Sequence, residues 1–328
     1  MNIVFRHKER IPVKTYGGTE RILWWLMKEL VELGHEVSLI GDPGSELKQI
    51  GAKLIPDTRS SDWQDLIPKN TDIVHLTLMS DVEAVKDHPT ILTIHGNGKL
   101  NERFQKNTVF LSKKHASNHN ATCYVYNGID FSEYPFQPKS TNNKNWQNFC
   151  FLAKANWSVK NLKDCIKVCK TAKKNLTVAG GRAYSLSKYI RSLGFIDNNK
   201  KLELLRSSNA LLFPVRWHEP FGVAIIEAYT QGLPVIGSNY GSLPELINKD
   251  TGILCNNYAE LLEAVSKEEN VFDAERIRVY AESKFNSKDM AKSYLKLYAE
   301  VIEGKNLNET YPEYSLKQDP ESLLPFGE

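Results

Sequence analysis

Cysteine is scarce in this chain, and long apolar runs are missing. The five cysteines form an odd set without paired Cys-x-x-Cys spacing, which argues against a disulfide framework and against a zinc site of that type. No apolar run approaches the roughly 20 residues that a membrane-spanning helix needs, and no secretory signal is evident. We therefore expect a cytoplasmic protein with reduced thiols and at most peripheral contact at the inner face of a membrane.

An excess of charge of one sign is also lacking. The formal net charge of +3, from 42 Lys plus Arg and 39 Asp plus Glu, is too small to favour nucleic acid as a partner. The hydrophobic fraction of 41% and the charged fraction of 25% are ordinary for a globular protein. A length of 328 residues leaves room for two domains with separate cores.

Short apolar runs alternate with amphipathic stretches along the chain, which is typical of α/β proteins. Strands are expected at 2–5, 37–40, 73–76, 90–94, 109–111 and 122–126, and then at 149–152, 176–178, 210–213, 234–236 and 252–254. Helices are expected at 19–33, 273–285 and 288–302. The two halves are separated by a polar segment with the composition of an interdomain linker. This order predicts two doubly wound, Rossmann-like domains that face a cleft.

The predicted boundaries are 1–134 for the first domain, 135–147 for the linker, 148–285 for the second domain and 286–328 for a terminal helix and tail. The tail from residue 306 contains Pro312, Pro320 and Pro325. We expect it to be irregular, either as an extended strap or as a disordered segment.

The most informative segment reads RWHEPFGVAIIEA and runs from Arg216 to Ala228. It joins an expected strand to an expected helix, and in open α/β sheets ligands bind where such strands end. A helix that begins near Gly222 offers backbone N–H groups and a positive dipole end to a phosphate. Glu219 lies in the preceding loop and Glu227 about one and a half turns into the helix. Because carboxylates accept hydrogen bonds from sugar hydroxyls, the segment could bind a nucleotide-sugar.

This segment resembles the Glu-x7-Glu signature of retaining glycosyltransferases of the GT-B fold, in particular the family 4 group (glycosyl transferases group 1). Further stretches follow the same family's order: Tyr16-Gly17-Gly18-Thr19-Glu20-Arg21, Leu33-Gly34-His35-Glu36-Val37, Asp72-Ile73-Val74-His75, Thr93-Ile94-His95-Gly96 and Tyr126-Asn127-Gly128-Ile129-Asp130. The resemblance covers most of the chain up to about residue 300.

The resemblance implies an α/β GT-B fold with terminal helices that cross back to the first domain. In that family the first domain receives the acceptor and the second binds the donor. The implied activity is retaining transfer of a hexose from a UDP- or GDP-linked sugar to a glycan or lipid-linked glycan, as in polysaccharide or lipopolysaccharide biosynthesis. The donor base, the acceptor and the oligomeric state stay open.

Negative charge grows on the departing phosphate during such a transfer, so a metal, basic groups or helix N-termini must stabilise it. The sequence has no Asp-x-Asp element of the kind that metal-dependent transferases use, so neither a metal nor another cofactor is expected. Lys154 and Lys160 stand where the family has an Arg and a Lys that hold the diphosphate. Their spacing is one residue longer than in the family, and Ala153 and Asn161 replace glycines. Two solvated lysines would be the alternative interpretation.

By the same resemblance, Glu219 positions the donor sugar, Glu227 binds the ribose, and the amides of Phe221, Gly222 and Val223 hold the phosphate or the sugar. We assign a catalytic contribution to Glu219 and Lys160.

His95 is the third residue to which the resemblance gives a catalytic part, because the family has a histidine at the matching strand end. A lone histidine there would otherwise be structural. Gly17 and Gly18 would close over the donor diphosphate, although any tight turn would also explain a glycine pair. Ser242 departs from the family's Gly-Gly-x-x-Glu element.

Two alternatives stay open beside the transferase. One is another enzyme of GT-B fold, a nucleotide-sugar epimerase or a phosphorylase. The Glu-Pro-Phe-Gly element argues against the epimerase, and the short chain without a recognisable pyridoxal-phosphate lysine segment argues against the phosphorylase. The other alternative is a non-catalytic subunit that binds sugar nucleotides, and hydrolysis of a donor sugar would discriminate it from an enzyme.

Overall fold

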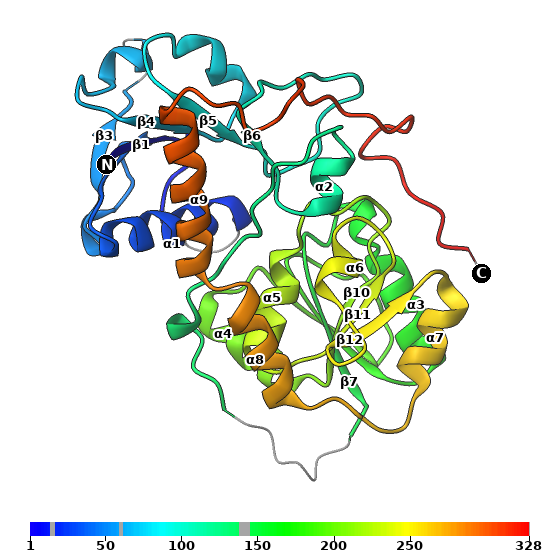
Figure 1. Ribbon diagram of the computed structural model, residues 1–328. Coiled ribbons are helices and arrows are strands. Elements are labelled where there is room, and N and C mark those ends of the chain that lie inside the picture. The colour runs from blue at the N-terminus through cyan, green and yellow to red at the C-terminus, as the bar shows by residue number, and fades with distance from the viewer. Residues whose placement is uncertain (14–16, 59–61, 138–144, 328) are drawn as a thin grey trace. The chain divides into compact units, whose positions relative to one another are not determined.

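The computed structural model describes residues 1–13, 17–58, 62–137 and 145–327 (Figure 1). Tyr16 of the glycine-pair motif and residues 138–144 of the predicted linker lie outside the described residues. The chain forms two compact units. Unit 1 comprises Met1–Asp130 and Phe285–Asp319, and unit 2 comprises Phe131–Lys284 and the segment from Pro320.

The sheet of unit 1 is parallel throughout its described strands, in the order β3-β2-β1-β4-β5-β6. Its strands are β1 (Asn2–Arg6), β2 (Glu36–Gly41), β3 (Lys53–Pro56), β4 (Ile73–Leu76), β5 (Thr90–Thr93) and β6 (Thr108–Val109). The central strands are buried on both faces, as their unbroken apolar runs require in a parallel sheet. The order reverses between β1 and β4, which makes this the topological switch point of unit 1.

Helices α1 (Gly18–Glu32) and α9 (Ser287–Ile302) pack against each other in unit 1, although they come from opposite ends of the chain (Figure 1). Glu29 accepts a hydrogen bond from the hydroxyl of Ser287 at 2.6 Å. His75 on β4 contacts the Tyr298 hydroxyl at 2.7 Å, and Tyr294 contacts Thr93. The terminal helix therefore belongs to the core of the first unit.

The sheet of unit 2 repeats the arrangement, again parallel, in the order β12-β11-β10-β7-β8-β9. Its strands are β7 (Asn148–Leu152), β8 (Asn175–Ala179), β9 (Ile190–Gly194), β10 (Ala210–Phe213), β11 (Val235–Ser238) and β12 (Gly252–Cys255). The switch point lies between β7 and β10, so the loops that follow these two strands are where a ligand is expected.

The other described α-helices are α2 (Lys113–Ser117), α3 (Leu162–Thr171), α4 (Asn198–Ser207), α5 (Val223–Thr230), α6 (Leu243–Leu246), α7 (Tyr258–Ser266) and α8 (Ala274–Lys284). Short 3₁₀ helices cover Lys48–Ile50, Trp63–Leu66, Met79–Ala84, Phe131–Glu133 and Ser158–Lys160. Side-chain caps define several starts: Asp197 accepts from the amide of Lys200 at 2.9 Å, and Asn286 from that of Asp289 at 2.8 Å. Such caps satisfy amides that have no partner within the helix. No helix in the described part of the chain is long and apolar enough to cross a membrane.

The strand expected at 122–126 is wrong. This segment makes only an isolated bridge, Phe110 with Tyr124, and the amides of Thr122 and Cys123 donate to the side-chain oxygen of Asn308 instead. A side chain from the C-terminal segment thus takes the hydrogen bonds that a neighbouring strand would have made.

The C-terminal tail differs in part from the expectation that it packs on the first domain. Up to Asp319 it belongs to unit 1, where the amides of Glu313 and Ser315 donate to the carbonyls of His119 and Asn118. From Pro320 it belongs to unit 2. Of the two forms considered for the tail, the structure shows an extended strap.

Candidate functional site

The switch point of unit 2 brings together two residues that lie far apart in the sequence. Lys160 closes the 3₁₀ turn in the connection that follows β7, and Glu219 lies in the loop that follows β10. The ammonium Nζ of Lys160 lies 2.5 Å from Oε2 of Glu219. Each residue is only 7% exposed, so the ion pair is shielded from solvent and is little weakened by salt.

Aromatic rings surround this ion pair. The indole N–H of Trp217 donates to the same Glu219 oxygen at 2.6 Å. The Lys160 ammonium lies 4.6 Å from the ring centre of Trp217, 5.1 Å from that of Trp157 and 5.4 Å from that of Phe213. Ring faces attract cations more strongly where water is excluded. The lysine is therefore held by the rings as well as by its carboxylate partner.

A second loop fixes the backbone on either side of Glu219. The amide of Ser242 donates to the Glu219 carbonyl at 2.9 Å, and the Ser242 hydroxyl donates to the Phe221 carbonyl at 2.7 Å. Gly241 has a φ of +57°, and a Cβ at this position would collide with the backbone of Glu219. The turn thus needs its glycine, and the serine that departs from the family pattern supplies both hydrogen bonds.

Helix α5 begins directly after this loop. Gly222 precedes it with a φ of +92° and a ψ of 63°, a left-handed conformation that glycine adopts without strain. The Gly222 carbonyl accepts from the amide of Ile225 at 2.9 Å. Phe221 is buried, and Val223 is the first helical residue. The predicted phosphate-binding amides therefore stand at the positive end of a helix, as that chemistry requires.

Glu227 lies within α5 and has its own set of partners. The Tyr134 hydroxyl donates to Glu227 Oε1 at 2.9 Å, and the Lys201 ammonium forms an ion pair with the same oxygen. Lys201 also contacts the Tyr134 hydroxyl at 3.3 Å. Glu227 is 7% exposed and Lys201 4%.

Lys201 was not among the residues predicted from the sequence, although a signal existed. Its position, three and four residues before the buried Leu204 and Leu205, places it on the inward face of α4. A lysine on such a face needs a partner for its charge.

Lys154 is not brought into this cluster. It follows β7 as expected, but its side chain is exposed. The structure therefore separates the two lysines, with Lys160 buried against Glu219 and Lys154 in solvent.

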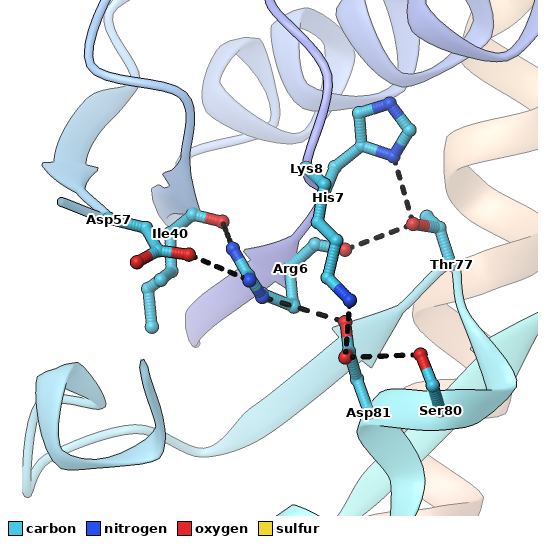
Figure 2. A network of polar contacts seen from close by, with 8 residues as sticks. All are labelled: Arg6, His7, Lys8, Ile40, Asp57, Thr77, Ser80 and Asp81. Carbon is cyan, nitrogen blue, oxygen red and sulfur yellow. Dashed lines mark hydrogen bonds and ion pairs between the residues drawn. The ribbon is translucent and has the colours of Figure 1, made fainter. Parts of the chain in front are cut away.

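The switch point of unit 1 carries a polar network at the ends of β1 and β4 (Figure 2). Arg6 is 3% exposed. Its guanidinium lies 2.7 Å from the Asp57 carboxylate, 3.5 Å from that of Asp81, and donates to the Ile40 carbonyl at 3.2 Å. Lys8 reaches the other Asp81 oxygen at 3.2 Å. This network was not predicted from the sequence, and its positive charges are compensated by the carboxylates of Asp57 and Asp81.

His7 lies beside that network, and its contact with Thr77 shows that its Nδ1 is a donor. The Thr77 hydroxyl donates to the Arg6 carbonyl at 3.1 Å, so it accepts from His7 Nδ1 at 2.9 Å (Figure 2). His7 Nε2 then faces Oε1 of Glu20 at 3.6 Å. Burial acts to raise the pKa of Glu20, but the interaction with the His7 ring and the hydrogen bond from its own backbone amide outweigh it and hold that pKa below its ordinary value.

His95 follows β5 as predicted, and Gly17 and Gly18 stand at the start of α1. Burial and the neighbouring His7 lower the pKa of His95 to about 4, so its imidazole is neutral at pH 7. Its Nε2 is buried and has no hydrogen-bond partner among the described residues.

A Cβ on Gly17 would collide with the Glu20 carboxylate. Gly17 thus leaves room for the side chain of Glu20.

Two further histidines hold the loop that begins at His95. His115 Nε2 donates to the Gly96 carbonyl at 2.9 Å, and His119 Nε2 accepts from the Gly98 amide at 2.9 Å. Burial lowers the pKa of both, to about 4 for His119. Because both rings are neutral, each can present the nitrogen that its partner requires.

Each unit is thus a doubly wound parallel sheet with a cluster of polar groups at its switch point. Two such units in one chain define the GT-B class of fold, and solved structures agree. A glycosyltransferase involved in avilamycin A biosynthesis, AviGT4, matches with a TM-score of 0.76 and 18% identity over 92% of this chain and 98% of that one. Anabaena HepE, solved in complex with UDP and glucose, matches with a TM-score of 0.68 and 16% identity over 91% and 99%. The predicted fold class is confirmed.

A family model matches a segment of the second unit. Residues 134–282 match the model of the glycosyl transferases group 1, so the expected glycosyltransferase domain is confirmed for this segment. A curated relative, the uncharacterized 41.2 kDa protein in the cps region of Klebsiella pneumoniae, is 31% identical over 153 residues. That match covers 42% of this chain and 41% of the relative, so it spans less than half of either protein.

Proposed function

We propose that the chain is a retaining, metal-independent glycosyltransferase that moves a hexose from a UDP- or GDP-linked sugar to a glycan or a lipid-linked glycan. The observation that carries the proposal is the buried Lys160–Glu219 pair beside the N-terminus of α5. It lies at the switch point of the unit that matches the glycosyl transferases group 1.

The chemistry of the site supports a separate part for each carboxylate. Glu219, held by Trp217 and Lys160, has the fixed orientation that is needed to accept hydrogen bonds from the hydroxyls of the donor hexose. Glu227, the fifth residue of α5, is the acceptor for the ribose hydroxyls. The amides of Phe221, Gly222 and Val223 would hold the diphosphate between them.

Charge stabilisation of the leaving diphosphate would come from the helix N-terminus and from lysine. Lys160 is already paired in the free protein, so a phosphate oxygen would have to share it with Glu219. At contact distance an ammonium and a phosphate charge attract each other by about 4 kcal/mol in a partly screened site. In the double role proposed here, Lys160 holds Glu219 in place and faces the departing oxygen, and no metal ion is required.

His95 is proposed to contact the donor sugar or the reaction centre. A neutral imidazole with an unsatisfied nitrogen suits a hydroxyl, because it can accept or donate one hydrogen bond without adding charge. In the retaining route favoured here the leaving phosphate takes the proton of the acceptor hydroxyl, so His95 positions a group and does not act as the base.

The test is calorimetric titration with UDP and with GDP, each with and without EDTA. We expect one nucleotide to bind tightly, with an affinity that EDTA does not change. Loss of binding in EDTA would refute metal independence. Binding of neither nucleotide would contradict the proposed donor. Binding without any hydrolysis of the matching sugar nucleotide would favour a non-catalytic subunit.

Two variants separate the parts of the carboxylates. Glu227→Gln is expected to weaken nucleotide binding about tenfold or more, because a charged hydrogen bond contributes about 1.5–3 kcal/mol. Glu219→Gln should not weaken nucleotide binding, because it releases Lys160 for the phosphate, and it should lower kcat for donor hydrolysis. Glu263→Gln, at an exposed position of α7, is the matched control. Equal nucleotide affinity for the wild type and Glu227→Gln would contradict the ribose assignment.

A further inference from the structure

The last residues of the chain form a strap on unit 2, here called the C-terminal strap (residues 320–327). Leu324 makes two hydrogen bonds with Arg216: its amide donates to the Arg216 carbonyl at 2.8 Å, and its carbonyl accepts from Arg216 Nε at 2.8 Å. The next carbonyl, that of Pro325, accepts from the Tyr240 hydroxyl at 2.5 Å. The strap is thus bonded to two different loops.

Burial shows that one face of the strap is docked. Leu324 and Phe326 are each 6% exposed, whereas the neighbouring Leu323 is 46% exposed. Gly327 adds a further anchor, because its carbonyl accepts from the amide of Tyr258 at 2.8 Å. Alternate side chains therefore point to the protein and to solvent, as in an extended segment that packs through one face.

The two loops that the strap joins are those that hold Glu219. Arg216 directly precedes Trp217, whose indole N–H bonds to the Glu219 carboxylate. Tyr240 directly precedes the turn in which Ser242 bonds to the Glu219 carbonyl. The strap thus bonds to Arg216, one residue from Trp217, and to Tyr240, two residues from Ser242. Trp217 and Ser242 are the residues whose contacts orient Glu219.

We propose that the C-terminal strap is a positioning element for Glu219, and through it for the sugar of the donor. This inference rests on the proposed function for the identity of the ligand and on the geometry above for the coupling. The strap fixes the distance between the two loops, and an error of about 1 Å in the position of a substrate-binding group can cost about a hundredfold in rate. Glu227 is held by Lys201 and Tyr134 instead, so nucleotide affinity should not depend on the strap.

The experiment compares the full chain with three changes: truncation after Asp319, Leu324→Ala, and Tyr240→Phe, which removes only the hydroxyl that bonds to Pro325. Leu323→Ala is the matched control, because it removes the same atoms from an exposed position. We expect the three changes to lower kcat for hydrolysis of the best UDP- or GDP-hexose about tenfold or more. Nucleotide affinity should stay within about twofold, and the control should resemble the wild type. A synthetic peptide of residues 320–328 should restore turnover to the truncated protein.

Amide hydrogen exchange supplies a readout that needs no activity. We expect faster exchange at residues 216–219 and 240–242 in the truncated protein, reversed by the peptide, with α5 unchanged. Unchanged exchange in these loops would overturn the inference even if the protein proves to be a transferase. A general loss of stability that lowers nucleotide affinity and turnover together would overturn it as well. If the wild type cleaves no sugar nucleotide, the proposed function fails, while the exchange result still decides whether the strap positions Glu219.

Discussion

The Lys160–Glu219 pair should contribute asymmetrically to stability, and a double-mutant cycle can measure this. Lys160→Met leaves the Glu219 carboxylate buried with the indole N–H of Trp217 as a donor. Removal of one partner of a buried ion pair costs about 3–5 kcal/mol. Glu219→Gln should cost less, about 1–3 kcal/mol, because the amide still accepts from Trp217 and the lysine keeps its surrounding rings.

The assay is thermal and urea unfolding of the wild type, Lys160→Met, Glu219→Gln and the double variant. A loss of about 3 kcal/mol corresponds to a Tm lower by roughly 6–12 °C for a domain of 150–250 residues. The coupling energy of the cycle should be about 2–3 kcal/mol. Lys163→Met, the same substitution at an exposed position on α3, should change stability by no more than about 0.5 kcal/mol.

Two outcomes would refute this reasoning. A coupling energy below about 0.5 kcal/mol would mean that the ion pair adds nothing beyond its separate surroundings. A greater loss for Glu219→Gln than for Lys160→Met would mean that the rings do not stabilise the lysine, and that the carboxylate is its essential partner.

Two further predictions concern pH and backbone geometry. His95 and His119 have pKa values near 4 in the folded protein against about 6.5 in an unfolded chain. The stability that their neutral forms contribute is therefore complete above pH 6.5 and is lost as pH falls toward 4. The loss is up to about 1.4 kcal/mol per pH unit for each histidine. Urea unfolding between pH 7 and 4 should show this slope, and His119→Gln should reduce it. Gly241→Ala should destabilise the protein by at least about 1 kcal/mol more than Gly34→Ala. Both replace a glycine with positive φ, but only the new Cβ at position 241 would meet the backbone of Glu219. Equal losses in thermal unfolding would contradict the close contact.

The sequence was sufficient for the strands that carry the two switch points. The strands expected at 73–76 and 210–213 coincide with β4 and β10, because buried parallel strands read as continuous apolar runs. Two of the edge strands lack that signal. β3 and β9 are partly exposed and were not predicted, since Lys53–Pro56 has only two apolar residues between its polar start and its proline.

The candidate residues Glu219, Glu227 and Lys160 could be singled out from the sequence because each lies in a family motif that follows a strand. The partners of these residues were not, because they are set by tertiary contacts. Lys201 reaches Glu227 across 26 positions of the sequence, and Leu324 reaches Arg216 across 108. No local pattern encodes such distances, and only the buried helical position of Lys201 gave a clue.

The structure also changes the attraction for a diphosphate that is expected from each of the two predicted lysines, Lys160 and Lys154. A lysine that is already neutralised by a carboxylate at 2.5 Å presents a dipole to an incoming phosphate, so it can supply only part of the roughly 4 kcal/mol that a lone ammonium would give. Lys154 is exposed, so binding a phosphate would cost it more desolvation than it costs Lys160. Among the described residues no carboxylate is seen to neutralise it as Glu219 neutralises Lys160. The N-terminus of α5, which needs no rearrangement, is then the first source of attraction for a diphosphate. Lys160 contributes most when Glu219 accepts hydrogen bonds from the sugar hydroxyls instead of from the lysine. Binding of the sugar and binding of the phosphate are coupled in this arrangement, because each draws on one member of the same ion pair.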